Sequence, residues 1–165
     1  MITDEGKQFV VSSSGQTIFG LIDSPEIKSA GILPGWIGLQ VGYPGPKGFG
    51  ARHVESNVDR MKAIRGLGFQ SFAQFCEKIA SSYTRVGQGE HGRLVLVLSH
   101  NGYEVWLVVE HKPAAIEPFW TIVTGVVSRR ARFKLLCEIM RTSGSEPTLN
   151  VAKRTRFETL SLPKK

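Results

Sequence analysis

Gly48-Phe49-Gly50-Ala51-Arg52-His53-Val54-Glu55 sets a glycine-rich loop directly against a predicted helix start, and the chain changes there from strand-like to helix-like periodicity. Glycines at positions 48 and 50 would let backbone amides approach a ligand closely. The first turn of a helix offers unpaired N–H donors and a positive dipole end, which suits a phosphate group. His53 adds a side chain of the type that exchanges protons near neutral pH. The alternative interpretation is a surface loop in which His53 makes a capping contact.

The chain before this junction has the pattern of short strands. Apolar runs at residues 9–11 and 17–22 are separated by a Ser-Ser-Ser-Gly segment, which predicts a β-hairpin. Residues 36–41 alternate large and small side chains and lead into a Gly/Pro-rich loop, so they predict one further strand. We therefore expect a small N-terminal β unit over residues 8–42.

Two helices are predicted after the junction, within residues 52–86. In the first, apolar side chains recur every three or four residues, and His53, Asn57 and Arg60 would share one stripe beside them. The second begins at Ser71, which Gln74 follows as in a capping box. Its apolar face is predicted to be core and consists of Phe72, Phe75, Cys76, Ile79, Ala80 and Tyr83.

The remaining chain predicts a twisted antiparallel sheet over residues 93–128. Its three runs are dense in β-branched and aromatic residues, and Asn101-Gly102 between the first two is the strongest short hairpin signal. An amphipathic segment within residues 131–142 predicts a final helix. Residues 145–165 are rich in Thr, Lys and Arg, and they predict a basic C-terminal extension that orders on a partner.

Composition indicates one domain, which we place at residues 1–144. A chain of 165 residues that is 41% hydrophobic can bury one sizeable core. Two cysteines, of which Cys76 is expected to be a buried thiol, do not form a disulfide framework and indicate a reducing compartment. No apolar run approaches the roughly 18 residues of a membrane span. We expect a protein of the cytoplasm, or one delivered into a target bacterial cytoplasm.

The net charge of +7 lies entirely in the C-terminal part of the chain. Residues 129–165 hold ten Lys/Arg against three Asp/Glu, so residues 1–128 hold eleven of each sign. A basic segment attached to a neutral body favours a polyanionic partner, with nucleic acid ahead of an acidic protein or a membrane surface. The alternative is a solvated basic tail without a partner.

The order of these elements resembles the phage and toxin branch of the barnase/EndoU/colicin/RelE-like (BECR) ribonuclease superfamily. The resemblance covers roughly residues 15–130. The segments that carry it are Phe19-Gly20-Leu21-Ile22, residues 35–42, residues 48–55, Gly68-Phe69-Gln70-Ser71-Phe72 with Phe75, and Phe119-Trp120-Thr121-Ile122-Val123-Thr124-Gly125. It implies an α+β fold in which a small N-terminal β unit and two helices precede a twisted antiparallel sheet, followed here by the C-terminal helix and basic tail.

The resemblance also implies an activity, namely cleavage of RNA without a metal ion or cofactor. A 2′-hydroxyl attacks the adjacent phosphate and leaves a 2′,3′-cyclic phosphate, which requires proton transfer and cations around the crowded phosphate. The residues expected to carry this chemistry are His53, Thr124, Arg60 and Glu55. The residues expected to bind substrate are Arg52, Lys62, Tyr83, Trp120, Arg129 and Arg130.

Several of these assignments have a structural alternative. Tyr83 and Trp120 also fit the core, Arg60 and Lys62 fit a solvated helix face, and Glu55 fits a residue that favours a helix N-terminus. Relatives commonly carry a second histidine about five residues beyond the first, where this chain has Ser56-Asn57-Val58-Asp59-Arg60. A substitute would have to come from His91, His100 or His111.

The expected partners are RNA, with tRNA as one candidate, and an acidic immunity or inhibitor protein. Two other functions stay open at this point. One is a non-catalytic domain that binds nucleic acid through its basic C-terminal third. The other is a phage or effector interaction module that docks on an acidic partner.

Overall fold

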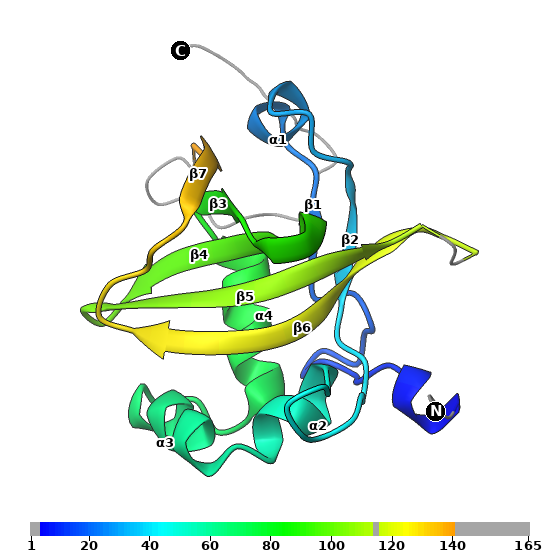
Figure 1. The fold of residues 1–165 in the computed structure, drawn as a ribbon, viewed down its shortest axis with the longest axis vertical. Helices are drawn as coiled ribbons and strands as arrows, with labels where there is room; N and C mark the ends of the chain where they lie inside the picture. The colour runs from blue at the N-terminus through cyan, green and yellow to red at the C-terminus, as the bar shows by residue number, and fades with distance from the viewer. Residues whose placement is uncertain (1–3, 114–115, 141–165) are drawn as a thin grey trace.

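The computed structural model describes residues 4–113 and 116–140, which form a mixed α+β domain around one curled sheet (Figure 1). Seven described strands pair in the order β1-β2-β6-β5-β4-β3-β7. All neighbours are antiparallel except β2 and β6, which run parallel. The strands are β1 (Gly20–Ile22), β2 (Gly35–Gly38), β3 (Arg85–Gln88), β4 (Leu94–His100), β5 (Tyr103–Lys112), β6 (Phe119–Ser128) and β7 (Lys134–Glu138).

The helices lie mainly on one side of this sheet. Figure 1 shows α4 crossing behind β5 and β6, with α2 and α3 beside β6. The main core lies between α4 and the sheet, where Phe72, Phe75 and Ile79 of α4 are fully buried. The helices are α1 (Pro25–Ser29), α2 (Gly50–Glu55), α3 (Val58–Gly66) and α4 (Phe72–Ser82), with 3₁₀ turns η1 (Asp4–Lys7) and η2 (Glu90–Gly92).

The predictions for α4 and for strands β4 to β6 are confirmed. Ser71 caps α4 by accepting a hydrogen bond from Gln74 N at 3.1 Å, and all six residues of the predicted apolar face, including Cys76, are buried. The Gln74 side chain accepts from Gln70 N instead of the cap residue itself. Asn101 and Gly102 both have positive φ, which is the geometry of a tight two-residue hairpin turn.

The predicted N-terminal hairpin is wrong, although the region does contribute a strand. Residues 17–22 yield only β1, which pairs with β2 and not with residues 9–11. Phe9 instead forms an isolated bridge with Gln40. The serine segment between the apolar runs makes its own turn, in which Ser12 N donates to Gln16 O and Gly15 N to Ser12 O. Helix α1 was not predicted.

The first predicted helix is broken into two, α2 and α3. Asn57 caps α3 by accepting a hydrogen bond from Arg60 N at 3.0 Å, so a new helix begins there. The predicted stripe of His53, Asn57 and Arg60 on one helix is therefore wrong.

The end of the domain is also different from the prediction. The helix expected within residues 131–142 is strand β7, which pairs with the edge of β3, and β3 occupies part of the predicted helical segment 52–86. The open edge of β3 offers unpaired backbone N–H and C=O groups. A short amphipathic segment can pair with them as a strand, and its own backbone groups are then satisfied without forming a helix. The extension at residues 145–165 lies outside the described residues.

Candidate functional site

Strand β6 presents two different faces. A Cβ atom at Gly125 would lie 2.8 Å from both Phe72 and Phe75 of α4, so Gly125 faces the helices. Side chains alternate along a strand, and Thr124 is therefore on the opposite face, which we call the outer face. The register confirms this position, since Thr124 lies opposite Val108 and Gly125 lies opposite the core residue Leu107.

Arg60 and Thr124 meet across 64 residues of sequence. The Arg60 guanidinium on α3 donates from Nη1 to Thr124 Oγ1 at 2.5 Å. Both side chains are partly exposed, and within the described chain Arg60 makes no ion pair with a carboxylate. Helix α3 packs beside β6, so the guanidinium stays at the edge of the outer face. The structure thus brings together two of the four residues expected to be catalytic.

His53 is held on the neighbouring helix α2, which also packs against β6. Its Nδ1 lies 2.8 Å from Gly45 O. A carbonyl oxygen only accepts, so Nδ1 carries the proton and the lone pair of the neutral ring is on Nε2. No hydrogen bond joins His53 to Arg60 or Thr124 among the described residues. The imidazole is therefore oriented by the loop before α2, and Nε2 has no hydrogen-bond partner among the described residues.

The start of α2 does not have the free amides expected of a phosphate site. Ala51 N donates to Gln40 O and Arg52 N donates to Val41 O, so these first-turn donors are already used. Gly50 has φ +77°, and a side chain there would collide with Gln40 O. The glycines therefore serve close packing of the loop against residues 40–43. This corrects the prediction of a phosphate site at the start of α2.

Three other predicted residues point elsewhere or are paired. Arg52 forms an ion pair with Glu5 at 2.7 Å. Glu55 lines a hollow of about 250 Å³ between α3 and the start of α4, together with Arg65 and Ser71. Lys62 is exposed on α3 and is turned about 200° from Arg60, since the two are two residues apart on a helix. The structure places none of the three against Thr124.

Tyr83 and Trp120 belong to the packed interior, which was the alternative to substrate binding for both residues. Tyr83 is 3% exposed, and its hydroxyl donates to Leu21 O at 2.7 Å. Trp120 is 4% exposed, and its Nε1 donates to Leu33 O at 3.0 Å. Neither ring presents a free face to a base, which corrects their assignment to substrate binding.

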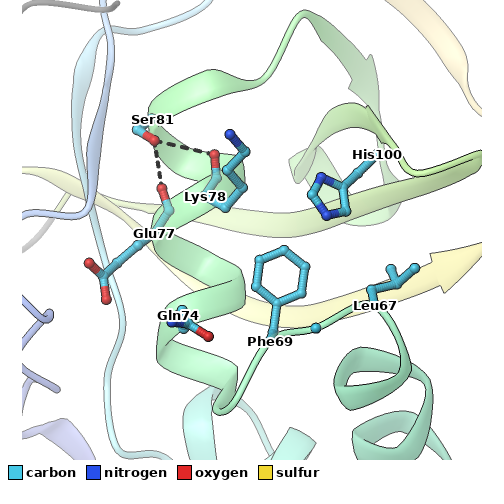
Figure 2. A pocket seen from close by; sticks show the side chains of 8 residues that line it. Leu67, Phe69, Gln74, Glu77, Lys78, Ser81 and His100 are labelled. Carbon is cyan, nitrogen blue, oxygen red and sulfur yellow. Dashed lines mark hydrogen bonds between the residues drawn. The ribbon is translucent and has the colours of Figure 1, made fainter.

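The remaining histidines lie away from the outer face. His100 lies on the helix side of β4, the same side as Leu98, and its ring centre lies 5.1 Å from that of Phe69 (Figure 2). It lines a hollow of about 480 Å³ beside α4 with Lys78 and Gln74. His111 packs against the Trp120 ring, and His91 is exposed in η2. Neither His100 nor His111 shares the face of Thr124.

The outer face also carries two acidic groups, each of which has partners. Glu104 on β5 accepts from Arg85 at 2.6 Å and from Ser99 at 2.6 Å. Partial burial alone would raise the pKa of Glu104, but the hydrogen bonds from Ser99 and Arg85 and the charge of Arg85 hold that pKa below its ordinary value. Glu110 is similar, because Lys112 and Arg93 lower its pKa against the opposing effect of burial.

Trp106 is a candidate that the sequence did not reveal. It lies on β5 between Val97 and Val126, in the row of the outer face next to that of Thr124. Its side chain is partly exposed, unlike that of Trp120. The signal in the sequence was the alternation along β5, in which Val105, Leu107 and Val109 are the core residues.

Arg129 and Arg130 are exposed at the end of β6, where the predicted basic segment begins. The Arg129 guanidinium lies 5.6 Å from the centre of the Tyr103 ring. Among the described residues, no three potential ligands gather closely enough to hold a metal ion. None of the described helices is long and apolar enough to span a membrane.

Comparison of the chain with protein-family models, with curated proteins and with solved structures finds no match.

Proposed function

We propose that this protein is an endoribonuclease that cleaves RNA by internal transesterification, with its reactive centre at the Arg60–Thr124 contact and His53. The observation that carries the proposal is the 2.5 Å hydrogen bond between Arg60 and Thr124. The BECR-like resemblance named these two residues separately. A guanidinium at the hydroxyl of a partly exposed strand residue is a suitable place for a phosphate.

The proposed step needs no group beyond water, substrate and these side chains. The 2′-oxygen attacks phosphorus and forms the 2′-O–P bond, while the P–O5′ bond breaks and a 2′,3′-cyclic phosphate remains. One proton leaves the 2′-hydroxyl and one reaches the 5′-oxygen. His53 Nε2 takes part in one of these transfers, and Arg60 stabilises the charge that accumulates on the non-bridging oxygens.

The test is cleavage of total bacterial RNA in EDTA by the wild-type protein and three variants, with product ends identified. We expect cyclic-phosphate ends from the wild type, and a loss of rate of at least about 100-fold in His53→Ala. Thr124→Val should lose a similar part of the rate, because it removes the hydroxyl that holds the Arg60 guanidinium. Valine keeps the shape of threonine, so the packing is unchanged. Lys62→Ala is the matched control, since it removes a cation from α3 that faces away from Thr124.

The outcomes separate the proposal from its alternatives. Cleavage that is equal in wild type and His53→Ala would contradict the role of His53. Intact RNA with every folded variant would contradict the enzyme altogether.

One observation favours a second function, which is nucleic-acid binding without cleavage. Four cations in and beside the connection from β6 to β7 are exposed and make no ion pair with a described carboxylate, namely Arg129, Arg130, Arg132 and Lys134. Such cations attract phosphates regardless of sequence. Salt-dependent RNA binding by a protein that leaves RNA intact would support this second function.

A further inference from the structure

The outer face of the sheet has an ordered arrangement of side chains around Trp106. The register places Val97, Trp106 and Val126 in one row across β4, β5 and β6, and Val95, Val108 and Thr124 in the next. Trp106 and Thr124 are therefore diagonal neighbours, a relation in which side chains are about 7–8 Å apart and aromatic rings still reach one another. The partly exposed indole lies beside the Arg60–Thr124 contact.

The charges around this face are those of a surface for an anion. Glu104 and Glu110 already accept hydrogen bonds from cations, so their charges are compensated. Arg60 has only the Thr124 hydroxyl as a side-chain partner among the described residues. At the far end of β6, Arg130 and Arg132 are exposed and without an ion pair in the described part of the chain.

Thr124 in the middle of β6 and Arg130 just beyond its end define a direction along the second half of the strand. They are six residues apart, which corresponds to at most roughly 20 Å. Arg60 beside Thr124 and Arg130 beyond the strand, with an aromatic ring between them, match a chain of phosphates with bases that can be splayed out. A double helix keeps its bases stacked, and therefore cannot present one to the indole.

We infer that the outer face binds single-stranded RNA along β6, with one base stacked on Trp106 next to the phosphate held by Arg60. This inference rests on the proposed RNA substrate and names the residue that holds the adjacent base. Trp106 is a binding residue in it and takes no part in proton transfer. Arg130 and Arg132 hold phosphates further along the same strand.

The experiment measures binding of a short, fluorescently labelled 2′-O-methyl RNA by anisotropy at fixed salt. This RNA lacks the attacking hydroxyl, so its affinity is measured without cleavage. We expect Trp106→Leu to weaken binding about tenfold, as the loss of one base–aromatic stack does, and Trp106→Phe to keep most of the affinity. The control Ile18→Ala, which trims another exposed apolar side chain before β1, should bind as the wild type does.

A duplex of the same sequence distinguishes stacking from charge. Its weaker binding should be equal in wild type and Trp106→Leu. Equal single-strand affinity in these two proteins would overturn the inference, and so would an equal loss for strand and duplex, or no binding of the strand by wild type.

A second readout covers the case in which Trp106→Leu does not fold. Trp120 is buried, whereas Trp36 is partly exposed and stacks on Phe119 at the start of β6, so the measurement is made in a Trp36→Phe background. Binding should quench intrinsic fluorescence in Trp36→Phe and leave it unchanged in Trp36→Phe/Trp106→Phe. Quenching that persists in the double variant would overturn the inference.

The inference and the proposed function can fail separately. Trp106-dependent binding together with uncleaved natural RNA would contradict only the chemistry. Cleavage that depends on His53, together with binding that ignores Trp106, would contradict only the position of the base.

Discussion

Gly125 shows at the level of one residue why Thr124 is available to a ligand. The absence of a side chain at position 125 lets Phe72 and Phe75 of α4 approach β6 closely. That close packing fixes which face of β6 is covered, and Thr124 is consequently left on the other face beside Arg60. A residue without any polar atom in its side chain thus determines the orientation of the candidate site.

We expect Gly125→Ala to lower the free energy of unfolding by about 1–3 kcal/mol, because the new methyl group would lie 2.8 Å from two phenylalanine rings. Chemical denaturation measures this change. Gly66→Ala is the matched control, since no atom lies within 4 Å of a Cβ atom there and alanine favours the helix, so it should stabilise α3 by about 0.5–1 kcal/mol. A Gly125→Ala protein as stable as the wild type would show that the assignment of the two faces is wrong.

At the level of secondary structure, strong local signals were sufficient for α4 and for β4 to β6. A six-residue apolar face with a capping serine, and an Asn-Gly turn between two β-branched runs, each leave one low-energy local solution. The regions predicted wrongly are those whose partner is distant in sequence. Residues 134–138 form a strand only because the edge of β3 is open to them, and residues 9–11 bridge residue 40 instead of their sequence neighbours.

The candidate site shows the same division between local and distant information. His53 was identified from a local pattern, but its orientation depends on Gly45 O. Trp120 and Trp106 both lie in apolar, strand-forming runs, and the folded structure shows that Trp120 is packed and Trp106 partly exposed. The contact of Arg60 with Thr124 joins residues 64 positions apart, so no local pattern contains it.

The strands that carry the outer face are linked by charge as well as by backbone. Arg85 on β3 and Ser99 on β4 both donate to Glu104 on β5. The pKa of Glu104 is lowered in the folded protein, so its ionised form stabilises the fold above its unfolded pKa of about 4.3. This contribution is lost as the pH falls through the lower folded pKa.

We therefore expect Glu104→Gln to cost about 1 kcal/mol at pH 7, with a difference from wild type that shrinks as the pH falls below about 4. The measurement is the free energy of unfolding by urea at a series of pH values. Glu90→Gln serves as the control, because Glu90 is exposed and has no ion pair among the described residues. A difference between wild type and Glu104→Gln that stays constant down to pH 2 would contradict the role of the ionised carboxylate.

At the level of the whole molecule, the described cations differ in whether they face a carboxylate. Two cations of the N-terminal part face carboxylates, since Arg52 pairs with Glu5 and Lys28 with Asp23. The cations after β6 have no such partner in the described part of the chain. Under the proposed function, RNA bound to these cations releases counterions there, and the salt dependence of binding reports how many phosphates they neutralise.

This difference leads to a quantitative expectation for the double variant Arg130→Ala/Arg132→Ala with single-stranded 2′-O-methyl RNA. Each phosphate contact contributes about 0.7 to the slope of log K against log salt, so losing two contacts should reduce the slope by about 1.4. The variant Lys28→Ala/Arg52→Ala removes the same net charge from paired positions and should keep the wild-type slope. Equal changes in both variants would mean that RNA senses only net charge, and that the end of β6 has no particular place in binding.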